Sequence, residues 1–396
     1  MKFSIFAIQG CLGMTFSILK LKSWFFSYAK LILHWWRGID KVILYSVFLL
    51  LFVGILMSLS VSPAIGARIG LEDGMYFFKK YIFFVLLGLL VLLFFSFINI
   101  KSLQKIAFFG FIILLFLLLL VLVSGEVVKG SRRWLNLYFF TLQPSEIMKP
   151  FFIVVNGYIV SRDVGRYFYI SLSSLLLLFC VLLLILEPDF GSVAVYLSLW
   201  FVQIFLGGVS RKFLSFIVPL PVVLAVIGFF FFPHFHNRIV GFVSKNIKFS
   251  SGINYQVSKS LDGIKNGGLF GMGLCEGVAK YQLPDSHTDY IVSVIVEEMG
   301  FVFLLFVIFL YFLITTKSLH RDYKGDKLRM IYVYSICFLL LIELFINICV
   351  AFNFLPSKGM VLPFISYGGS GMIANSILIG MLLNLVRLNG DLKNNL

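Results

Sequence analysis

Long apolar stretches follow one another along most of the chain and are separated by short polar segments. An apolar run of about 20 residues is long enough to cross a bilayer as an α-helix. The pattern predicts ten such spans, at residues 43–61, 80–98, 105–124, 144–160, 168–187, 190–208, 213–232, 290–315, 330–352 and 363–386. We therefore expect an all-α, polytopic membrane protein with a large extracytoplasmic loop between its seventh and eighth helices.

The polar segments that fall on one side of these spans are rich in lysine and arginine. They include Lys101, Lys105, Arg162, Arg166, Arg211, Lys212 and the segment 317–329. Cytoplasmic loops carry an excess of such residues. An even number of spans puts both termini on one side, so we predict that both termini are cytoplasmic. The loop 233–288 then lies on the extracytoplasmic side.

Composition supports this class, because 60% of the residues are hydrophobic and 13% are charged, against about 25% charged in soluble proteins. The net charge of +15 does not indicate nucleic-acid binding, since the basic residues lie in short loops. The five cysteines form no C-x-x-C pair, and no disulfide is predicted. We expect an interfacial lead at 1–42, with Met14 as an alternative start, a membrane domain at 43–388 and a cytoplasmic tail at 389–396.

The segment "GSRRWLNLYFFTLQPSEIMKP" precedes and opens the fourth span. Glu146 and Lys149 are three residues apart, so they share a helix face. They could form a local ion pair, with Arg133 in an interfacial anchor, or face a polar cavity in the bundle.

The turn "EPDFG" places Glu187 and Asp189 between two spans. One interpretation is a tight turn capped by Asp189. The other is a site for a cation or for sugar hydroxyls.

The stretch "INYQVSKSLDGIKNGGLFGMGLCEG" predicts a short amphipathic helix followed by a glycine-rich loop. The loop could be merely flexible, or its backbone N–H groups could approach an anion. It lacks P-loop spacing.

The stretch "LPDSHTDYIVSVIVEEMG" places Asp289, Ser293 and Glu297 at i, i+4 and i+8. We expect them on one stripe of the eighth span, with Asp289 at the water edge and Glu297 about 12 Å deeper. His287 lies beside Asp289. Helix capping by Asp289 or Thr288 would explain a single polar residue but not the stripe.

The stretch "LPSKGMVLPFISYGGSGM" places Lys358 before a span that we expect to begin at Pro363. Its small residues favour close helix packing. Glu343 and Asn347 are four residues apart in the ninth span, and we expect them to hydrogen-bond in the bundle. His234 and His236 lack partners at metal-ligand spacing, so no metal site is predicted.

These motifs, in this order over residues 130–370 and together with the predicted spans, resemble the SEDS family, which comprises FtsW, RodA and SpoVE. The lysine in "LPSKG" resembles the division type, FtsW, more than the elongation type, RodA. The chain departs from the family pattern in three places: "SYGGSG" stands for "SYGGSS", "LPDSHTDY" stands for "LPEAHTDF", and Glu343 stands where glutamine is more familiar.

The resemblance implies a peptidoglycan glycosyltransferase that polymerises lipid II beside a class B penicillin-binding protein, among other divisome membrane proteins. It implies that Asp289 is the catalytic base, since a carboxylate can take the proton of the attacking hydroxyl. Cations can stabilise the leaving pyrophosphate. Residues expected to bind substrate or to orient these cations are Arg133, Glu146, Lys149, Glu187, Asp189, His287, Glu297, Lys358 and Ser366.

A divalent cation, Mg²⁺ or Mn²⁺, could also bind the pyrophosphate, although no ligand spacing in the sequence demands one. Two other functions remain open from the sequence. A lipid II flippase would need a polar path that opens to both faces of the membrane. A divisome scaffold that recruits the transpeptidase would not need the carboxylates.

Overall fold

The computed structural model describes residues 30, 33–128, 131–137, 140–162, 165–209, 252–323, 325–356 and 359–387. Most of the predicted N-terminal lead, the predicted seventh span, His234, His236 and Lys358 lie outside the described residues. Residues Val42–Leu385 form one compact unit, and all contacts given below belong to it.

The described part of this unit is mainly helical. Its helices are α2 (Lys41–Ile69), α3 (Tyr76–Phe97), α4 (Ile100–Ser124), α5 (Pro144–Ser161), α6 (Arg166–Leu186), α7 (Phe190–Leu206), α11 (Gly252–Gly267), α12 (Ala279–Gln282), α13 (Ile291–Met299), α14 (Phe301–Leu319), α15 (Lys327–Ala351) and α16 (Gly369–Leu385). In the described part, six helices are long and apolar enough to cross a membrane, and α7 and α16 are shorter apolar helices. The predicted class, an all-α polytopic membrane protein, is confirmed.

Three predicted boundaries are wrong. Helix α2 continues through Pro63 to Ile69. The predicted eighth span is two helices, because the chain turns at Gly300 with φ 88° between α13 and α14. Helix α16 begins at Gly369 and not at Pro363, because Phe364 has φ 63°, a conformation that does not fit a right-handed helix.

The segment between α4 and α5 forms a small antiparallel sheet that the sequence did not predict. Its strands β1 (Glu126–Val128), β2 (Ser131–Asn136) and β3 (Thr141–Leu142) lie in the order β1-β2-β3. Side chains alternate between the two faces of a strand, and in β2 the alternation buries Ser131, Arg133 and Leu135. The sheet therefore turns Arg133 towards the protein interior.

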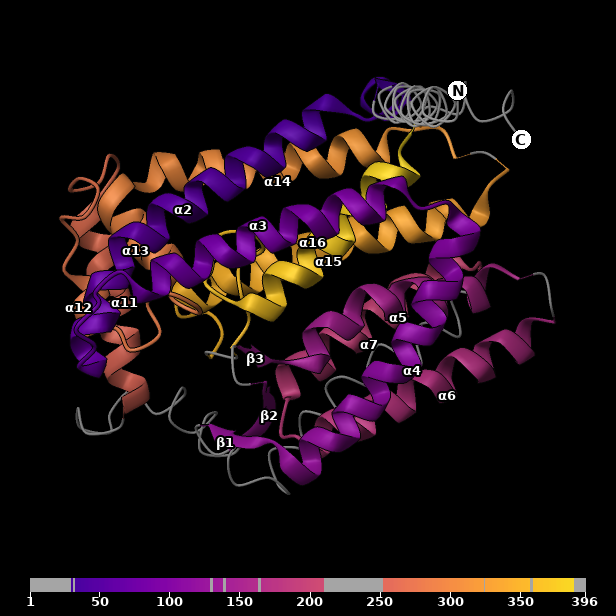
Figure 1. Cartoon of the computed structure of the whole chain (residues 1–396), viewed down its shortest axis with the longest axis horizontal. Helices are drawn as coiled ribbons and strands as arrows, with labels where there is room; N and C mark the ends of the chain where they lie inside the picture. The colour runs from indigo at the N-terminus through magenta and orange to yellow at the C-terminus, as the bar shows by residue number, and fades with distance from the viewer. Residues whose placement is uncertain are drawn as a thin grey trace, which may run out of the picture. The chain divides into compact units, whose positions relative to one another are not determined.

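Helix α5 packs against α4, α7, α15 and α16, and α16 packs along α3 (Figure 1). Glycines allow the second of these contacts. A Cβ atom on Gly369 would lie 2.4 Å from the Phe84 ring, and one on Gly380 would lie 2.6 Å from the Leu92 carbonyl. The packing interpretation of the small residues in "SYGGSG" is confirmed for Gly369.

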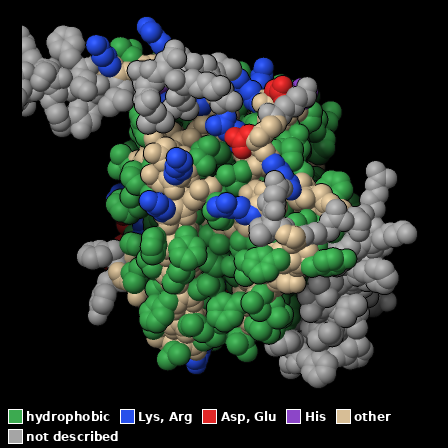
Figure 2. Space-filling view, turned by 90° about the vertical axis from the view of Figure 1, so that its right-hand side faces the viewer, with side chains coloured by type: hydrophobic (Ala, Val, Ile, Leu, Met, Phe, Trp, Pro, Cys, Tyr) green, Lys and Arg blue, Asp and Glu red, His purple; other side chains and the backbone are tan. Residues whose placement is uncertain are grey.

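The connections α3–α4, α5–α6 and α14–α15 lie at the same end of the helices (Figure 1). This end faces the viewer in Figure 2, which shows many lysine and arginine side chains and few carboxylates. Lys101, Lys105, Arg162 and Lys317 lie in or beside these connections and are exposed. These four basic residues therefore lie at one end of the bundle, as the sequence predicted.

Candidate active site

Asp289 lies in a turn that precedes α13. The Asp285 carbonyl accepts hydrogen bonds from the backbone N–H groups of Thr288 at 3.1 Å and of Tyr290 at 3.2 Å. The Asp289 side chain is buried, with 6% of the residue exposed. Its Oδ2 accepts a hydrogen bond from the Gly359 N–H at 2.9 Å. The α13 N-terminus has no side-chain cap, so the capping interpretation of this segment is wrong.

The segment around Asp289 is attached to the segment that precedes α16. The Ser366 hydroxyl donates to the Thr288 carbonyl at 2.9 Å, and the Tyr367 N–H donates to the His287 carbonyl at 2.8 Å. The His287 ring lies 5.7 Å from the Tyr367 ring and 5.9 Å from the Phe77 ring, between centroids. His287 and Ser366 thus hold the two segments together, and their contact with substrate stays a prediction.

Gly359 lies between Asp289 and Arg133. Its N–H binds the Asp289 carboxylate, and a Cβ atom on Gly359 would point towards Arg133 Nη1, 4.0 Å away. Gly359 has φ 73°, a conformation that glycine adopts without strain. The structure therefore brings Asp289 and Arg133 together around one peptide. Lys358 precedes this glycine in the sequence, although its own position is not described.

Arg133 is paired with Asp189, and its Nη1 lies 3.3 Å from Asp189 Oδ1. Asp189 is also the N-cap of α7, because its Oδ1 accepts from the Ser192 N–H at 3.3 Å and its Oδ2 from the Ser192 hydroxyl at 2.7 Å. The capping interpretation is confirmed for Asp189. The ion pair that joins the "EPDFG" turn to strand β2 is an additional finding.

Glu187 ends α6 and is fully buried in the described structure. Neither of its carboxylate oxygens has a hydrogen-bond partner among the described residues. The pKa of Glu187 is raised from 4.5 to about 8, chiefly by burial and also by the Asp189 charge, while Arg133 acts to lower it. Its surroundings therefore favour the protonated, neutral form of the carboxyl group.

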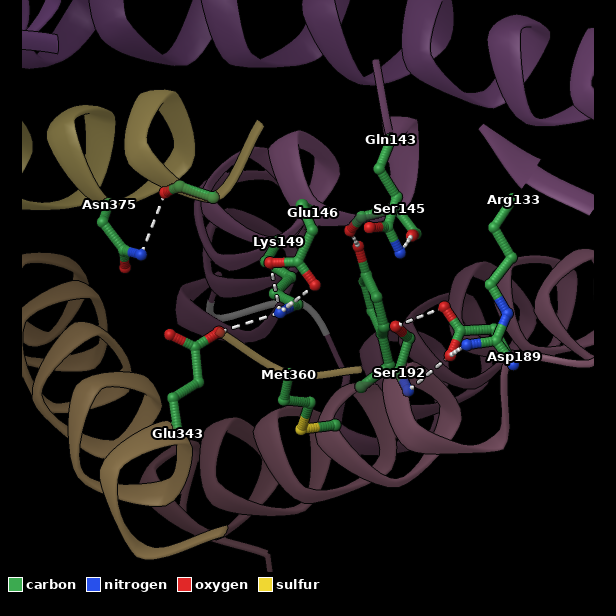
Figure 3. A network of polar contacts seen from close by, with 12 residues as sticks. Arg133, Gln143, Ser145, Glu146, Lys149, Asp189, Ser192, Glu343, Met360 and Asn375 are labelled. Carbon is green, nitrogen blue, oxygen red and sulfur yellow. Dashed lines mark hydrogen bonds and ion pairs between the residues drawn. The ribbon is translucent and has the colours of Figure 1, made fainter. Parts of the chain in front are cut away.

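Lys149 forms a buried cluster with two carboxylates (Figure 3). Its Nζ lies 2.8 Å from both oxygens of Glu146 and 2.8 Å from Glu343 Oε1. The Glu146–Lys149 ion pair predicted from spacing is confirmed, but the pair is enclosed and not open to solvent, since 2% of the Lys149 residue is exposed. With both carboxylates ionised, the cluster carries a net charge of −1.

The prediction that Glu343 and Asn347 hydrogen-bond in the bundle is confirmed, and the described partner of each lies on another segment. Glu343 binds Lys149 on α5, and Asn347 Nδ2 donates to the Met360 carbonyl at 3.0 Å. The two residues are one helix turn apart on α15. Glu343 connects α15 to α5, and Asn347 connects it to the segment that follows Gly359.

The predicted common stripe is present for two of its three members. The Ser293 hydroxyl lies 2.5 Å from the Ser260 hydroxyl on α11. Glu297 Oε2 accepts from the Ala279 N–H at 2.8 Å. Asp289 precedes the helix and binds elsewhere, so its place on the stripe is wrong. Because Glu297 binds a backbone N–H of its own chain, its substrate-binding role stays a prediction.

The glycine-rich segment 267–277 wraps around the end of α13. The Met272 N–H donates to the Glu297 carbonyl and the Gly273 N–H to the Glu298 carbonyl, both at 2.9 Å. These groups therefore satisfy orphan carbonyls at a helix end. This contact argues against the predicted anion site at these two N–H groups.

Two contributions to the site were missed by the sequence analysis, namely Gly359 and Arg68. The Arg68 guanidinium donates to the Leu283 and Pro284 carbonyls at 2.7 and 2.6 Å. The position of Arg68 in the last turn of α2 was the signal in the sequence that could have indicated it. The same position is also favoured by the helix dipole, so the signal was not specific. Within the described residues, no group of three or more His, Cys, Asp and Glu side chains could hold a metal ion.

The fold and the site define a multi-pass membrane protein with a buried carboxylate and a guanidinium at one end of its helices. The chain belongs to the FtsW/RodA/SpoVE family, described as cell cycle proteins, whose model matches residues 40–390. One relative, the probable peptidoglycan glycosyltransferase FtsW of Caulobacter vibrioides, is 34% identical over 89% of this chain and 90% of its own length. The protein of the same description from Buchnera aphidicola is 31% identical over 89% and 94%.

Solved structures share the fold. The rod shape determining protein RodA of Thermus thermophilus aligns with a TM-score of 0.65 and 24% identity, over 89% of this chain and 97% of that one. A chain from a peptidoglycan synthase complex that coordinates polymerization and crosslinking aligns with a TM-score of 0.70 and 23% identity, over 88% and 97%. Both matches extend over nearly the whole membrane domain.

Proposed function

We propose that this protein is a peptidoglycan glycosyltransferase that polymerises lipid II into glycan strands during cell division. Relatives described as probable peptidoglycan glycosyltransferase FtsW, at 31–34% identity over most of the chain, support this activity. The observation that carries the proposal is the placement of Asp289. Its carboxylate is buried, oriented by the Gly359 N–H and separated from Arg133 by a single peptide.

The reaction joins the 4-hydroxyl oxygen of one lipid-linked sugar to the anomeric carbon of another. As the new C–O bond forms, the bond from that carbon to the pyrophosphate breaks, and undecaprenyl pyrophosphate leaves with the bonding electrons. Asp289 takes the hydroxyl proton as general base, a role that typically contributes about 10²–10⁴-fold to the rate. The Gly359 N–H fixes the direction of the carboxylate.

Arg133 and Lys358 are the cations we assign to the leaving pyrophosphate, because preorganised positive charge stabilises charge that develops in the transition state. Arg133 lies on the other side of Gly359 from Asp289, and its charge is shared with Asp189. Lys149 is already enclosed by two carboxylates. We therefore assign Glu146 and Lys149 the role of holding α5 against α15.

We place the protein in the cell inner membrane with both termini in the cytoplasm and Asp289 on the periplasmic side. The exposed Lys101, Lys105, Arg162 and Lys317, which lie in or beside the connections at the opposite end, support this orientation. The partner we propose is a class B penicillin-binding protein, which would crosslink the strands that this chain makes. The likeness in fold to a chain of a peptidoglycan synthase complex supports such a partnership.

The test is glycan synthesis by the purified protein. Lipid II in detergent is incubated with the protein alone and with a class B penicillin-binding protein, and the products are separated by length on a gel. The proposal expects lysozyme-sensitive strands, in larger amount when the partner is present. If lipid II stays intact in both reactions while the preparation is monodisperse, the polymerase proposal is wrong. Transport of lipid II across vesicles under those conditions would favour a flippase.

A further inference from the structure

We propose that Arg68 is a positioning residue for the catalytic base, holding from α2 the turn that carries Asp289. This inference rests on the proposed function. It is independent of the substrate contacts assigned above, because Arg68 contacts the protein backbone.

Arg68 binds the segment that leads into the turn. Its two terminal nitrogens donate to two successive carbonyls, Nη1 to Leu283 at 2.7 Å and Nη2 to Pro284 at 2.6 Å. A planar guanidinium with two fixed donors determines direction as well as distance. Leu283 is fully buried, so the carbonyl it presents to Arg68 belongs to a well-packed part of the chain.

The turn transmits this constraint to Asp289. The next residue after Pro284 is Asp285, whose carbonyl accepts the N–H groups of Thr288 and Tyr290, the two neighbours of Asp289. The Ser286 hydroxyl donates back to the Lys280 carbonyl at 3.3 Å. These hydrogen bonds connect residues 283–284 to both neighbours of Asp289, so we expect movement at residues 283–284 to displace the carboxylate.

A second contact on α2 holds the other end of the same segment. Lys280, on α12, lies 2.7 Å from Glu298 Oε1, with side chains 1% and 0% exposed. The Ser60 hydroxyl donates to the same Glu298 oxygen at 2.6 Å and lies 3.0 Å from Lys280 Nζ. Ser60 and Arg68 are about 12 Å apart along α2. Helix α2 therefore contacts both ends of the stretch 280–284. Figure 1 shows the end of α2 beside this stretch.

Catalysis depends on the placement of a base within a fraction of an ångström, and a misplacement of about 1 Å can cost about 10²-fold in rate. Arg68→Ala removes both guanidinium donors to residues 283 and 284. The hydrogen bond from the Gly359 N–H to the Asp289 carboxylate remains. We expect kcat to fall about 10- to 100-fold. The lipid II concentration at half-saturation should stay within about twofold, because no substrate contact is lost.

The experiment compares Arg68→Ala, Arg68→Lys and a matched control, Lys79→Met. Lys79 is a cation at the start of α3 whose pair with Asp73 is exposed, at 70% and 48% of the two side chains, and such pairs contribute little. Two measurements are made on monodisperse protein, glycan synthesis against lipid II concentration and amide hydrogen exchange of residues 285–290. Exchange at Thr288 and Tyr290 should be at least about tenfold faster in Arg68→Ala, with α14 unchanged.

Arg68→Lys retains the positive charge but not the two fixed donors of the guanidinium, so its kcat should lie between those of Arg68→Ala and wild type. Lys79→Met should match wild type in both measurements. The inference is overturned by wild-type kcat in Arg68→Ala or by unchanged exchange at residues 288 and 290. The inference is also overturned if Arg68→Ala changes only the lipid II concentration at half-saturation and not kcat. It is overturned as well if kcat falls equally in Arg68→Ala and Lys79→Met. If Arg68→Ala does not fold, wild-type kcat and exchange in Arg68→Lys overturn it. If wild type makes no glycan, the proposed function fails, and the exchange measurement still decides the positioning.

Discussion

Replacing Lys149 by methionine tests whether the buried charges of α5 and α15 form one structural unit. The Lys149 ammonium is the described partner of two carboxylates, at 2.8 Å from each, and the three side chains are 2–7% exposed. Lys149→Met leaves Glu146 and Glu343 facing each other without their cation. Breaking a buried ion pair by removing one partner costs about 3–5 kcal/mol. Two stranded carboxylates place this variant at the upper end of that range.

Glu343→Gln is the matched comparison. An amide oxygen at this position can still accept from Lys149 Nζ, and the Glu146–Lys149 pair remains. The cluster becomes neutral and no charge is left unpaired. We expect a change of about 1 kcal/mol or less, the size of a typical hydrogen-bond rearrangement.

The assay is an SDS titration of purified protein in mild detergent, which gives the free energy of unfolding for each variant. Glycan synthesis is measured on the folded fraction in parallel. Lys149→Met should unfold at a clearly lower SDS fraction and polymerise poorly, and Glu343→Gln should resemble wild type. If Lys149→Met unfolds at the same SDS fraction as wild type and Glu343→Gln unfolds at a lower one, the ion pairs of Lys149 do not hold α5 against α15.

Three further predictions concern other parts of the molecule. Because burial raises the pKa of Glu187 from 4.5 to about 8, the free energy of unfolding should fall as pH rises from 4.5 through 8. Glu187→Gln should lessen that slope in SDS titrations at several pH values, and an identical slope would contradict the burial argument. A Cβ atom on Gly267 would lie 1.9 Å from the Val296 carbonyl oxygen, whereas one on Gly165 meets nothing. Gly267→Ala should therefore lose about 1–3 kcal/mol and Gly165→Ala much less, and equal losses would argue against the close contact. Cys275 is exposed, so an impermeant maleimide should label it from the periplasmic side of intact spheroplasts. In a Cys275→Gly background, a cysteine at Arg321 should react only after permeabilisation, and the reverse pattern would invert the proposed orientation.

Helix positions could be predicted from the sequence because the bilayer demands long apolar segments whatever the helices pack against. Helix ends could not. Hydropathy does not register the positive φ of Gly300, which splits the predicted eighth span, or the positive φ of Phe364, which precedes the start of α16 at Gly369. Asp289 lies in the turn before Ile291, the first residue of α13, so the helical spacing that assigned it to the stripe does not apply to it.

The candidate site was predicted where a local spacing implied a contact and was missed where partners are distant in the chain. Glu146 and Lys149 are three residues apart, so their ion pair follows from helix geometry. Glu343 is 194 residues from Lys149, and Arg68 is 215 residues from Leu283. Arg68 binds backbone carbonyls and Gly359 donates its own backbone N–H, and backbone groups have no residue-type pattern that a sequence would show.

The measurement that tests the central claim most directly is glycan synthesis by purified Asp289→Asn protein with no other polymerase present. Asparagine keeps the size of the side chain and can still accept from the Gly359 N–H, but it has almost no basicity. The account predicts that this variant binds lipid II and its transpeptidase partner like wild type, while its rate falls about 10²–10⁴-fold. Asp262→Asn, which alters a half-exposed carboxylate on α11, should retain full activity. Wild-type glycan synthesis by Asp289→Asn would contradict the assignment of Asp289 as the base.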